Sequence, residues 1–235
     1  MYATDPARLE AALAALLGPE FVVSVAGRGS APTGSAHHRR NGAGQAHADA
    51  GQGRGTADDG HGGRAPGTDR RMEHRIGRAA LRRVAERLGE RVDTDRLVLP
   101  HPRLTLTHSY GVAVAVGARH RASTGIGVDL EAVRPVNPGI ARLFLTPAER
   151  AQLGAAPSVD EPTGEPDVLL RLWTVKEAVF KADTGNSGRI LADYELRHPT
   201  AWSGRATRGR SRFRYRTVQL PGHVVSVAVH EERTA

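Results

Sequence analysis

The sequence contains no cysteine, and only two of its 33 basic residues are lysines. The absence of cysteine excludes a disulfide framework and thiolate metal sites, and it suits a reducing compartment. No stretch approaches the roughly 18 uninterrupted apolar residues that a membrane-spanning helix needs. The N-terminus also lacks the basic segment of a secretory signal. We therefore expect a cytoplasmic protein with no membrane partner.

Aromatic residues are scarce as well, with 2 Trp, 4 Tyr and 4 Phe among 235 residues. Nucleic-acid-binding proteins often stack bases on such side chains, and we recognise no nucleic-acid-binding motif. The net charge of +8 therefore does not by itself predict a nucleic-acid partner. The charge favours acidic partners in general, namely nucleic acid, a phosphorylated small molecule or an acidic protein, and it does not choose among them.

Large apolar residues are missing from residues 28–68, which are rich in Gly and Ala. Such a stretch buries too little apolar surface to offset the entropy of ordering, so we expect a disordered insertion. It would interrupt an N-terminal subdomain formed by residues 1–27 and 69–119. Residues 120–235 would form a C-terminal subdomain.

Outside this stretch, helical and strand patterns alternate, which is typical of an α+β fold. Helices or helical turns are expected at residues 6–17, 68–89, 137–145, 146–153 and 169–183. Strands are expected at residues 20–26, 96–99, 103–107, 111–118, 124–133, 212–220 and 223–231. The segments "GVAVAVGA" and "HVVSVAVHE" are alike, so the chain is interpreted as two related α+β halves.

One predicted strand, "GIGVDLEAV", carries Asp129 and Glu131. Residues two apart on a strand share a face, about 6–7 Å from each other. Two carboxylates at this spacing favour a cation between them, and oxygen ligands without Cys or clustered His indicate a hard cation such as Mg²⁺. The alternative is an exposed strand edge with solvated acids.

Both lysines lie in one predicted helix, "LLRLWTVKEAVFKAD". Lys176 falls within the apolar arc of this helix, where a lysine needs an anion or a route to solvent. Glu177 and Lys181 are four apart and are neighbours on the helix surface. An ordinary surface ion pair explains these two residues but not Lys176. A third carboxylate from Glu177, with lysines nearby, indicates Mg²⁺-assisted phosphoryl chemistry.

Four segments together resemble the Sfp-type 4′-phosphopantetheinyl transferases. "GIGVDLE" and "WTVKEAVFK" are similar to the two halves of that family's signature, and "LTLTHS" to its Ser/Thr-His-Ser segment. "RRMEHRIGR" is similar to a helix start in the siderophore-associated branch, with His74 where that branch has an aromatic residue. The resemblance covers residues 70–181.

The resemblance implies two similar α+β subdomains with the active site in the cleft between them. It also implies a reaction, that of a holo-acyl-carrier-protein synthase. The phosphopantetheine arm of coenzyme A would pass to a serine of an acidic acyl- or peptidyl-carrier protein, releasing 3′,5′-ADP. Such carriers serve fatty-acid, polyketide or nonribosomal peptide synthesis. A monomer is expected, because one chain holds both halves.

The resemblance further implies roles for single residues. Asp129, Glu131 and Glu177 would hold Mg²⁺. Glu177 would also help take the serine proton, with Lys181 and Lys176 as catalytic cations beside it. The groups expected to contact the phosphates of coenzyme A are Lys181, His108, Arg71 and Arg78.

Two alternatives remain open at this point. One is a catalytically silent module of the same fold that binds coenzyme A or a carrier protein. The other concerns Arg212, Arg214 and Arg216, which alternate along a predicted strand and so share one face. They form either a docking strip for an acidic partner or a solvated edge strand.

Overall fold

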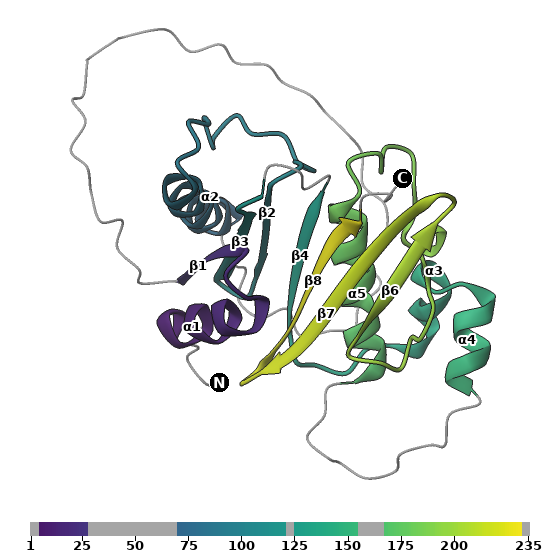
Figure 1. Cartoon of the computed structure of the whole chain (residues 1–235). Coiled ribbons are helices and arrows are strands. Elements are labelled where there is room, and N and C mark those ends of the chain that lie inside the picture. The colour runs from purple at the N-terminus through teal and green to yellow at the C-terminus, as the bar shows by residue number, and fades with distance from the viewer. Residues whose placement is uncertain (1–4, 28–69, 121–124, 155–166, 232–235) are drawn as a thin grey trace, which may run out of the picture.

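The structure is a computed structural model, and it describes residues 5–27, 70–120, 125–154 and 167–231 (Figure 1). The side chains of Leu16, Arg70 and Arg71 are also outside the description. The insertion expected at residues 28–68 lies outside the described residues. Among the helices that are described, none is long and apolar enough to cross a bilayer.

Helices and strands follow one another along the described chain. The α-helices are α1 (Pro6–Leu17), α2 (Arg70–Leu88), α3 (Ala141–Phe144), α4 (Pro147–Gly154) and α5 (Val168–Ala182). Two short 3₁₀ helices are η1 (Pro138–Ile140) and η2 (Leu191–Asp193). The strands are β1 (Phe21–Gly27), β2 (Leu104–Ser109), β3 (Val112–Ala118), β4 (Ile126–Ala132), β5 (Glu195–Leu196), β6 (Ser203–Arg208), β7 (Ser211–Leu220) and β8 (His223–Glu231).

The strands form two antiparallel sheets. The first sheet has three strands in the order β1-β3-β2, and the second has five in the order β4-β8-β7-β6-β5 (Figure 1). The expected α+β fold is confirmed. The similarity of the two halves stays a prediction.

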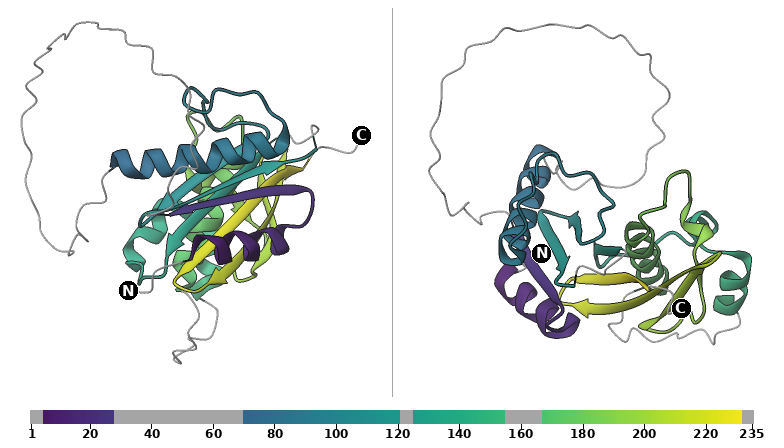
Figure 2. Two further views of the ribbon diagram at one scale, coloured as in Figure 1. Left: turned by 90° about the vertical axis from the view of Figure 1, so that its left-hand side faces the viewer. Right: turned by 45° about the horizontal axis from the view of Figure 1, so that its top comes forward.

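Apolar side chains pack in separate clusters against the two sheets. Helix α2 covers one face of the first sheet, with Ala80, Leu81 and Val84 against β1, β2 and β3. Helix α5 covers one face of the second sheet, with Val175 and Val179 in its core. A third cluster contains residues of α1, β1, β3, β4 and β8, and so joins the two sheets. In Figure 2 (right), α1 and α2 lie with the first sheet, and α3, α4 and α5 with the second.

Helix α5 is fixed at both ends. At its start, Asp167 accepts a hydrogen bond from the Leu169 backbone N–H (2.8 Å), which satisfies one of the free donors of a helix N-terminus. At its end, the buried Asp183 accepts a hydrogen bond from the Tyr194 hydroxyl (2.8 Å) and pairs with Arg208 (2.7 Å). The residues along α5 are therefore held in a defined register against the second sheet.

The expected strands differ from the structure at residues 96–99, and strands β5 and β6 were not expected. Residues 96–99 form no strand, and Val98 is 79% exposed; this segment belongs to the loop between α2 and β2. The prediction was wrong because a short β-branched and leucine-rich run does not become a strand without a neighbouring strand to pair with. Strand β6 was missed because "SGRATR" has one buried apolar residue, Ala206, and no alternation.

Candidate active site

Strand β4 and helix α5 approach each other closely at two glycines. A Cβ on Gly127 would lie 1.9 Å from the Ala178 carbonyl oxygen, and one on Gly125 would lie 1.9 Å from that of Ala182. Any larger residue would push the helix away from the strand. The "GIG" of the sequence therefore lets α5 pack directly on β4. This contact brings Asp129 of β4 to the last turns of α5.

Asp129 lies at the centre of this contact and is 5% exposed. Its Oδ1 accepts hydrogen bonds from Lys181 Nζ (2.7 Å) and Thr107 Oγ1 (3.1 Å). Its Oδ2 is buried and has no hydrogen-bond partner among the described residues. A buried carboxylate oxygen without a partner costs free energy. Asp129 Oδ2 is thus an acceptor available to a ligand.

Two further carboxylates lie within electrostatic reach of Asp129. Glu177 Oε2 is 3.9 Å from Lys181 Nζ. Burial raises the pKa of Glu177, Lys181 opposes this shift, and the Asp129 charge adds to it. Burial, followed by the charge of Asp129, likewise raises the pKa of Glu131, while Arg134, Lys181 and a hydrogen bond with Trp173 oppose that rise. The segments "GIGVDLE" and "WTVKEAVFK" thus contribute acids to one site.

The carboxylates do not converge as a preformed metal site. Within the described ranges, no group of three or more His, Asp or Glu side chains is close enough together to hold a metal ion. The Lys181 ammonium instead contacts both Asp129 and Glu177. The donor chemistry still fits a hard cation, since three carboxylates interact here and Asp129 Oδ2 has no partner. Ligation of Mg²⁺ by Asp129, Glu131 and Glu177 stays a prediction.

The structure does not bring Lys176 to these acids. Its side chain is fully buried, and Nζ donates to Glu149 Oε2 (2.8 Å) and to the Tyr194 carbonyl. Glu149 is also fully buried, and its Oε1 accepts from the Leu196 N–H (2.6 Å). The anion that the apolar position of Lys176 requires is therefore a carboxylate of the protein. Lys176 was expected as a catalytic cation beside Glu177, and this arrangement places its ammonium on Glu149 instead.

The residues expected at the nucleotide lie on α2 and β2. His108 is about half exposed, with Nδ1 3.6 Å from Glu73 Oε2 of α2. The Arg78 guanidinium contacts the carbonyls of Thr94 and Leu97, so it holds the loop between α2 and β2. Arg71 lies in the first turn of α2, and its side chain is outside the described residues. Their roles at coenzyme A remain predictions.

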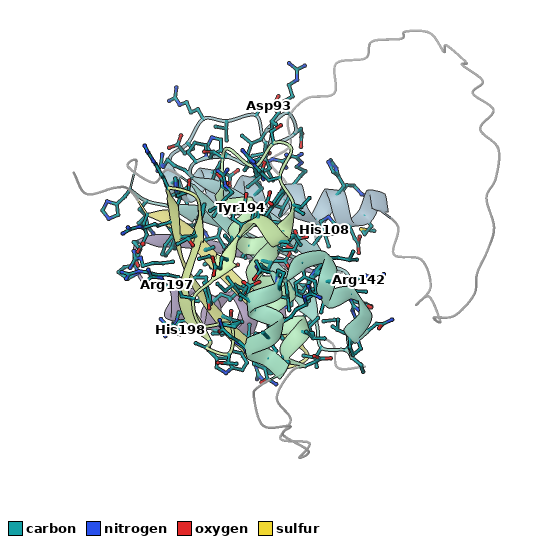
Figure 3. The ribbon with its side chains drawn as sticks, turned by 90° about the vertical axis from the view of Figure 1, so that its right-hand side faces the viewer. Asp93, His108, Arg142, Tyr194, Arg197 and His198 are labelled. Carbon is teal, nitrogen blue, oxygen red and sulfur yellow. The ribbon has the colours of Figure 1, made fainter. Side chains whose placement is uncertain are left out.

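A cavity of about 760 Å³ lies elsewhere, between the end of α1 and the outer face of the second sheet. Its basic lining residues are His120, Arg197, His198, Arg205, Arg214 and Arg216. Two of these arginines, Arg205 and Arg214, already pair with Glu231 (3.6 and 3.0 Å). Arg214 alternates on β7 with Phe213 and Tyr215, which pack towards α5. The arginine strip therefore faces away from the acids; Figure 3 shows Arg197 and His198 on one side of the molecule and His108 on the other.

Two residues with contacts to the lysines or acids of the motifs were not predicted from the sequence. Thr107 contacts Asp129, and the alternation in "LTLT" is the signal that places Thr105 and Thr107 on one face of β2. Glu149 forms a capping box with Thr146 at the start of α4: the Thr146 N–H donates to the Glu149 carboxylate, and the Glu149 N–H donates to Thr146 Oγ1. No sequence signal links Glu149 to Lys176.

The family comparison agrees with this geometry. Residues 125–228, which include β4, α5 and the acids they carry, match the family model of the 4′-phosphopantetheinyl transferase superfamily. A search among curated proteins found no match. Over residues 125–228, the chain is therefore similar to this superfamily.

Proposed function

We propose that this protein transfers the 4′-phosphopantetheine group of coenzyme A to a serine of an acyl- or peptidyl-carrier protein. The products are the holo carrier and 3′,5′-ADP, and the reaction depends on Mg²⁺. The match of residues 125–228 to the superfamily model supports phosphopantetheine transfer in general. The donor, the metal and the acceptor are the proposal.

One observation carries the proposal. Asp129 of β4 and Glu177 of α5 come from separate half-motifs, yet both contact the ammonium of Lys181. Beside them, Asp129 Oδ2 is buried and lacks a hydrogen-bond partner among the described residues. A site that combines carboxylates, a cation and an unsatisfied acceptor suits a reaction in which charged phosphate oxygens must be positioned and neutralised.

In this reaction, Glu177 and Lys181 would act on the reacting atoms. The serine oxygen attacks the phosphorus that carries pantetheine, and the bond from this phosphorus to the oxygen of the 3′,5′-ADP group breaks. Glu177 helps take the serine proton as a general base. Lys181 stabilises the negative charge on the departing ADP.

The remaining residues would bind and orient. Asp129, Glu131 and Glu177 would hold Mg²⁺, which when bound neutralises charge on the pyrophosphate. His108 would contact the nucleotide phosphates, and Arg71 and Arg78 the 3′-phosphate. Lys176 is assigned a different task, which is to fix α5 through Glu149.

The test is incubation of the protein with coenzyme A, Mg²⁺ and several apo carrier proteins, followed by mass spectrometry of each carrier. We expect a carrier to gain the mass of phosphopantetheine. Glu177→Gln should lower the rate by roughly 10²- to 10³-fold or more, because both a base and a charge are lost. Glu86→Gln, a change at an exposed residue of α2, is the matched control and should be neutral.

An absence of mass gain on every carrier would refute the transferase proposal and favour a silent binding module. Binding of coenzyme A measured in the same samples would identify such a module. A fully active Glu177→Gln protein would refute the assigned base.

A further inference from the structure

Two threonines of the first sheet reach the edge strand of the second sheet. Strands β2 and β4 belong to different sheets but lie side by side (Figure 1). The Val128 N–H donates to Thr105 Oγ1 (3.2 Å), and Thr107 Oγ1 donates to Asp129 Oδ1 (3.1 Å). Both threonines are buried. Since they are two residues apart on one strand, their side chains leave the same face.

The two threonines make different kinds of contact. Thr105 accepts from a backbone N–H at the free edge of β4, which satisfies a buried donor. Thr107 donates to the functional carboxylate itself. The first contact joins the sheets, and the second also acts on the orientation of a site residue.

The hydrogen bonds of Asp129 are divided unevenly between its oxygens. Oδ1 receives two donors from different elements, Thr107 on β2 and Lys181 on α5. Oδ2 receives none from the described residues, although it is buried. Two donors that approach one oxygen from separate elements fix the plane of the carboxylate, and so they fix the direction of the other oxygen.

We propose that Thr107 is a positioning residue that aims Asp129 Oδ2 at the bound cation. The proposal rests on the proposed function, because it takes Asp129 as a ligand of a divalent metal. Without the Thr107 hydroxyl, Lys181 is the remaining donor to the Asp129 carboxylate among the described residues, and this long side chain also contacts Glu177. The carboxylate can then turn with the lysine. The first sheet thereby contributes to a metal site whose ligands all lie on β4 and α5.

The experiment compares three variants with the unaltered protein. Thr107→Val removes the hydroxyl with little change in shape, and Thr107→Ser keeps a hydroxyl. Thr105→Val makes the same change two residues away on the same face, and is the matched control. Direct Mn²⁺ binding is measured by electron paramagnetic resonance, with and without coenzyme A, and needs no turnover. The Mg²⁺ concentration for half-maximal transfer is a second readout.

We expect Thr107→Val to weaken Mn²⁺ binding about tenfold, the usual scale for loss of a residue that orients a metal ligand. Thr107→Ser and Thr105→Val should stay within about twofold of the unaltered protein, on the same reasoning. The transfer rate of Thr107→Val should recover largely at high Mg²⁺, with an unchanged KM for the carrier.

Mn²⁺ binding by Thr107→Val that equals that of the unaltered protein would overturn the proposal. Equal weakening by Thr105→Val would overturn it too, since the effect would then reflect contact between the sheets. Should valine prevent folding, Thr107→Ala removes the same hydroxyl and is judged by the same criteria. An unaltered protein that modifies carriers without binding Mn²⁺ would refute the positioning role and the metal ligands, but not the transfer itself. The expected Mn²⁺ pattern without any carrier modification would refute the proposed reaction alone.

Discussion

Lys176 and Lys181 lie on the same helix and each contacts a carboxylate, but their surroundings are opposite. Lys176 and Glu149 are both fully buried, 2.8 Å apart. Lys181 is about one third exposed, and it contacts Asp129 at 2.7 Å and Glu177 at 3.9 Å. We call Lys176 with Glu149 the sealed pair, and Lys181 with Asp129 the open pair; Glu177 lies beside the open pair.

The difference lies in how completely each pair is satisfied. In the sealed pair, the backbone of Leu196 and Thr146 donates to Glu149, and the Tyr194 carbonyl accepts from Lys176. In the open pair, Asp129 Oδ2 lacks any such partner within the described part of the chain. Buried charges that satisfy each other offset each other's cost of desolvation, whereas a buried charge that remains unsatisfied is available for chemistry. One helix thus serves both purposes, on different faces.

The largest expected effect follows from removing the lysine of the sealed pair. Lys176→Met leaves the Glu149 carboxylate buried without its cation, so we expect the free energy of unfolding to fall by about 3–5 kcal/mol. Urea denaturation followed by circular dichroism measures it. The comparison variant is Lys181→Met, which should cost less stability, because that lysine is partly exposed and water can replace part of its contact.

A double replacement tests whether the loss of stability comes from the unpaired Glu149 carboxylate. Lys176→Met with Glu149→Leu removes both buried charges, and it should recover much of the lost stability. If Lys176→Met is as stable as the unaltered protein, the sealed pair contributes nothing and the contrast between the two lysines fails.

The next effect concerns the transfer rate. Replacing Lys181 should lower this rate more than replacing Lys176 does, whereas for stability Lys176 matters more. Lys181→Met removes the cation at the acids, so the transfer rate should fall about 100-fold, in the range for loss of one group that stabilises developing charge. Saturating rates measured by mass spectrometry of the carrier test this. A loss of rate that matches the loss in Lys176→Met, at equal fractions of folded protein, would remove the distinction between the pairs.

Much of the open pair was predictable from the sequence. Asp129 and Glu131 share a strand face by period two, and Glu177 and Lys181 share a helix face by period four, so local geometry fixes each half. Their meeting is not local. It requires the close approach of β4 and α5 at Gly127, which was not predicted from the sequence. That the acids act together was implied by the resemblance to a known family, not by periodicity.

The sealed pair shows why the remainder could not be predicted. The position of Lys176 in an apolar arc indicates that it needs an anion, but the arc does not say which one. Glu149 lies on a separate helix, and its cap role was the local signal available. The contact of Thr107 with Asp129 is of the same kind, because it joins two sheets whose relative placement depends on the whole core.

The smallest effect tests geometry within the open pair while keeping the charge. Lys181→Arg replaces a compact ammonium by a wider planar guanidinium, in a space where Nζ is 2.7 Å from Asp129 Oδ1. The guanidinium should pair with Asp129 through two nitrogens and draw on Oδ2, the oxygen that the proposed cation needs. We expect the transfer rate to fall about tenfold, which raises the activation free energy by about 1.4 kcal/mol, with stability unchanged.

Rates at a series of Mg²⁺ concentrations separate two causes. If arginine competes for Asp129 Oδ2, the Mg²⁺ concentration needed for transfer rises, whereas a defect at the leaving group lowers the rate at every concentration. A fully active Lys181→Arg protein would mean that charge alone matters at this position, and the open pair would then differ from the sealed pair in exposure but not in geometry.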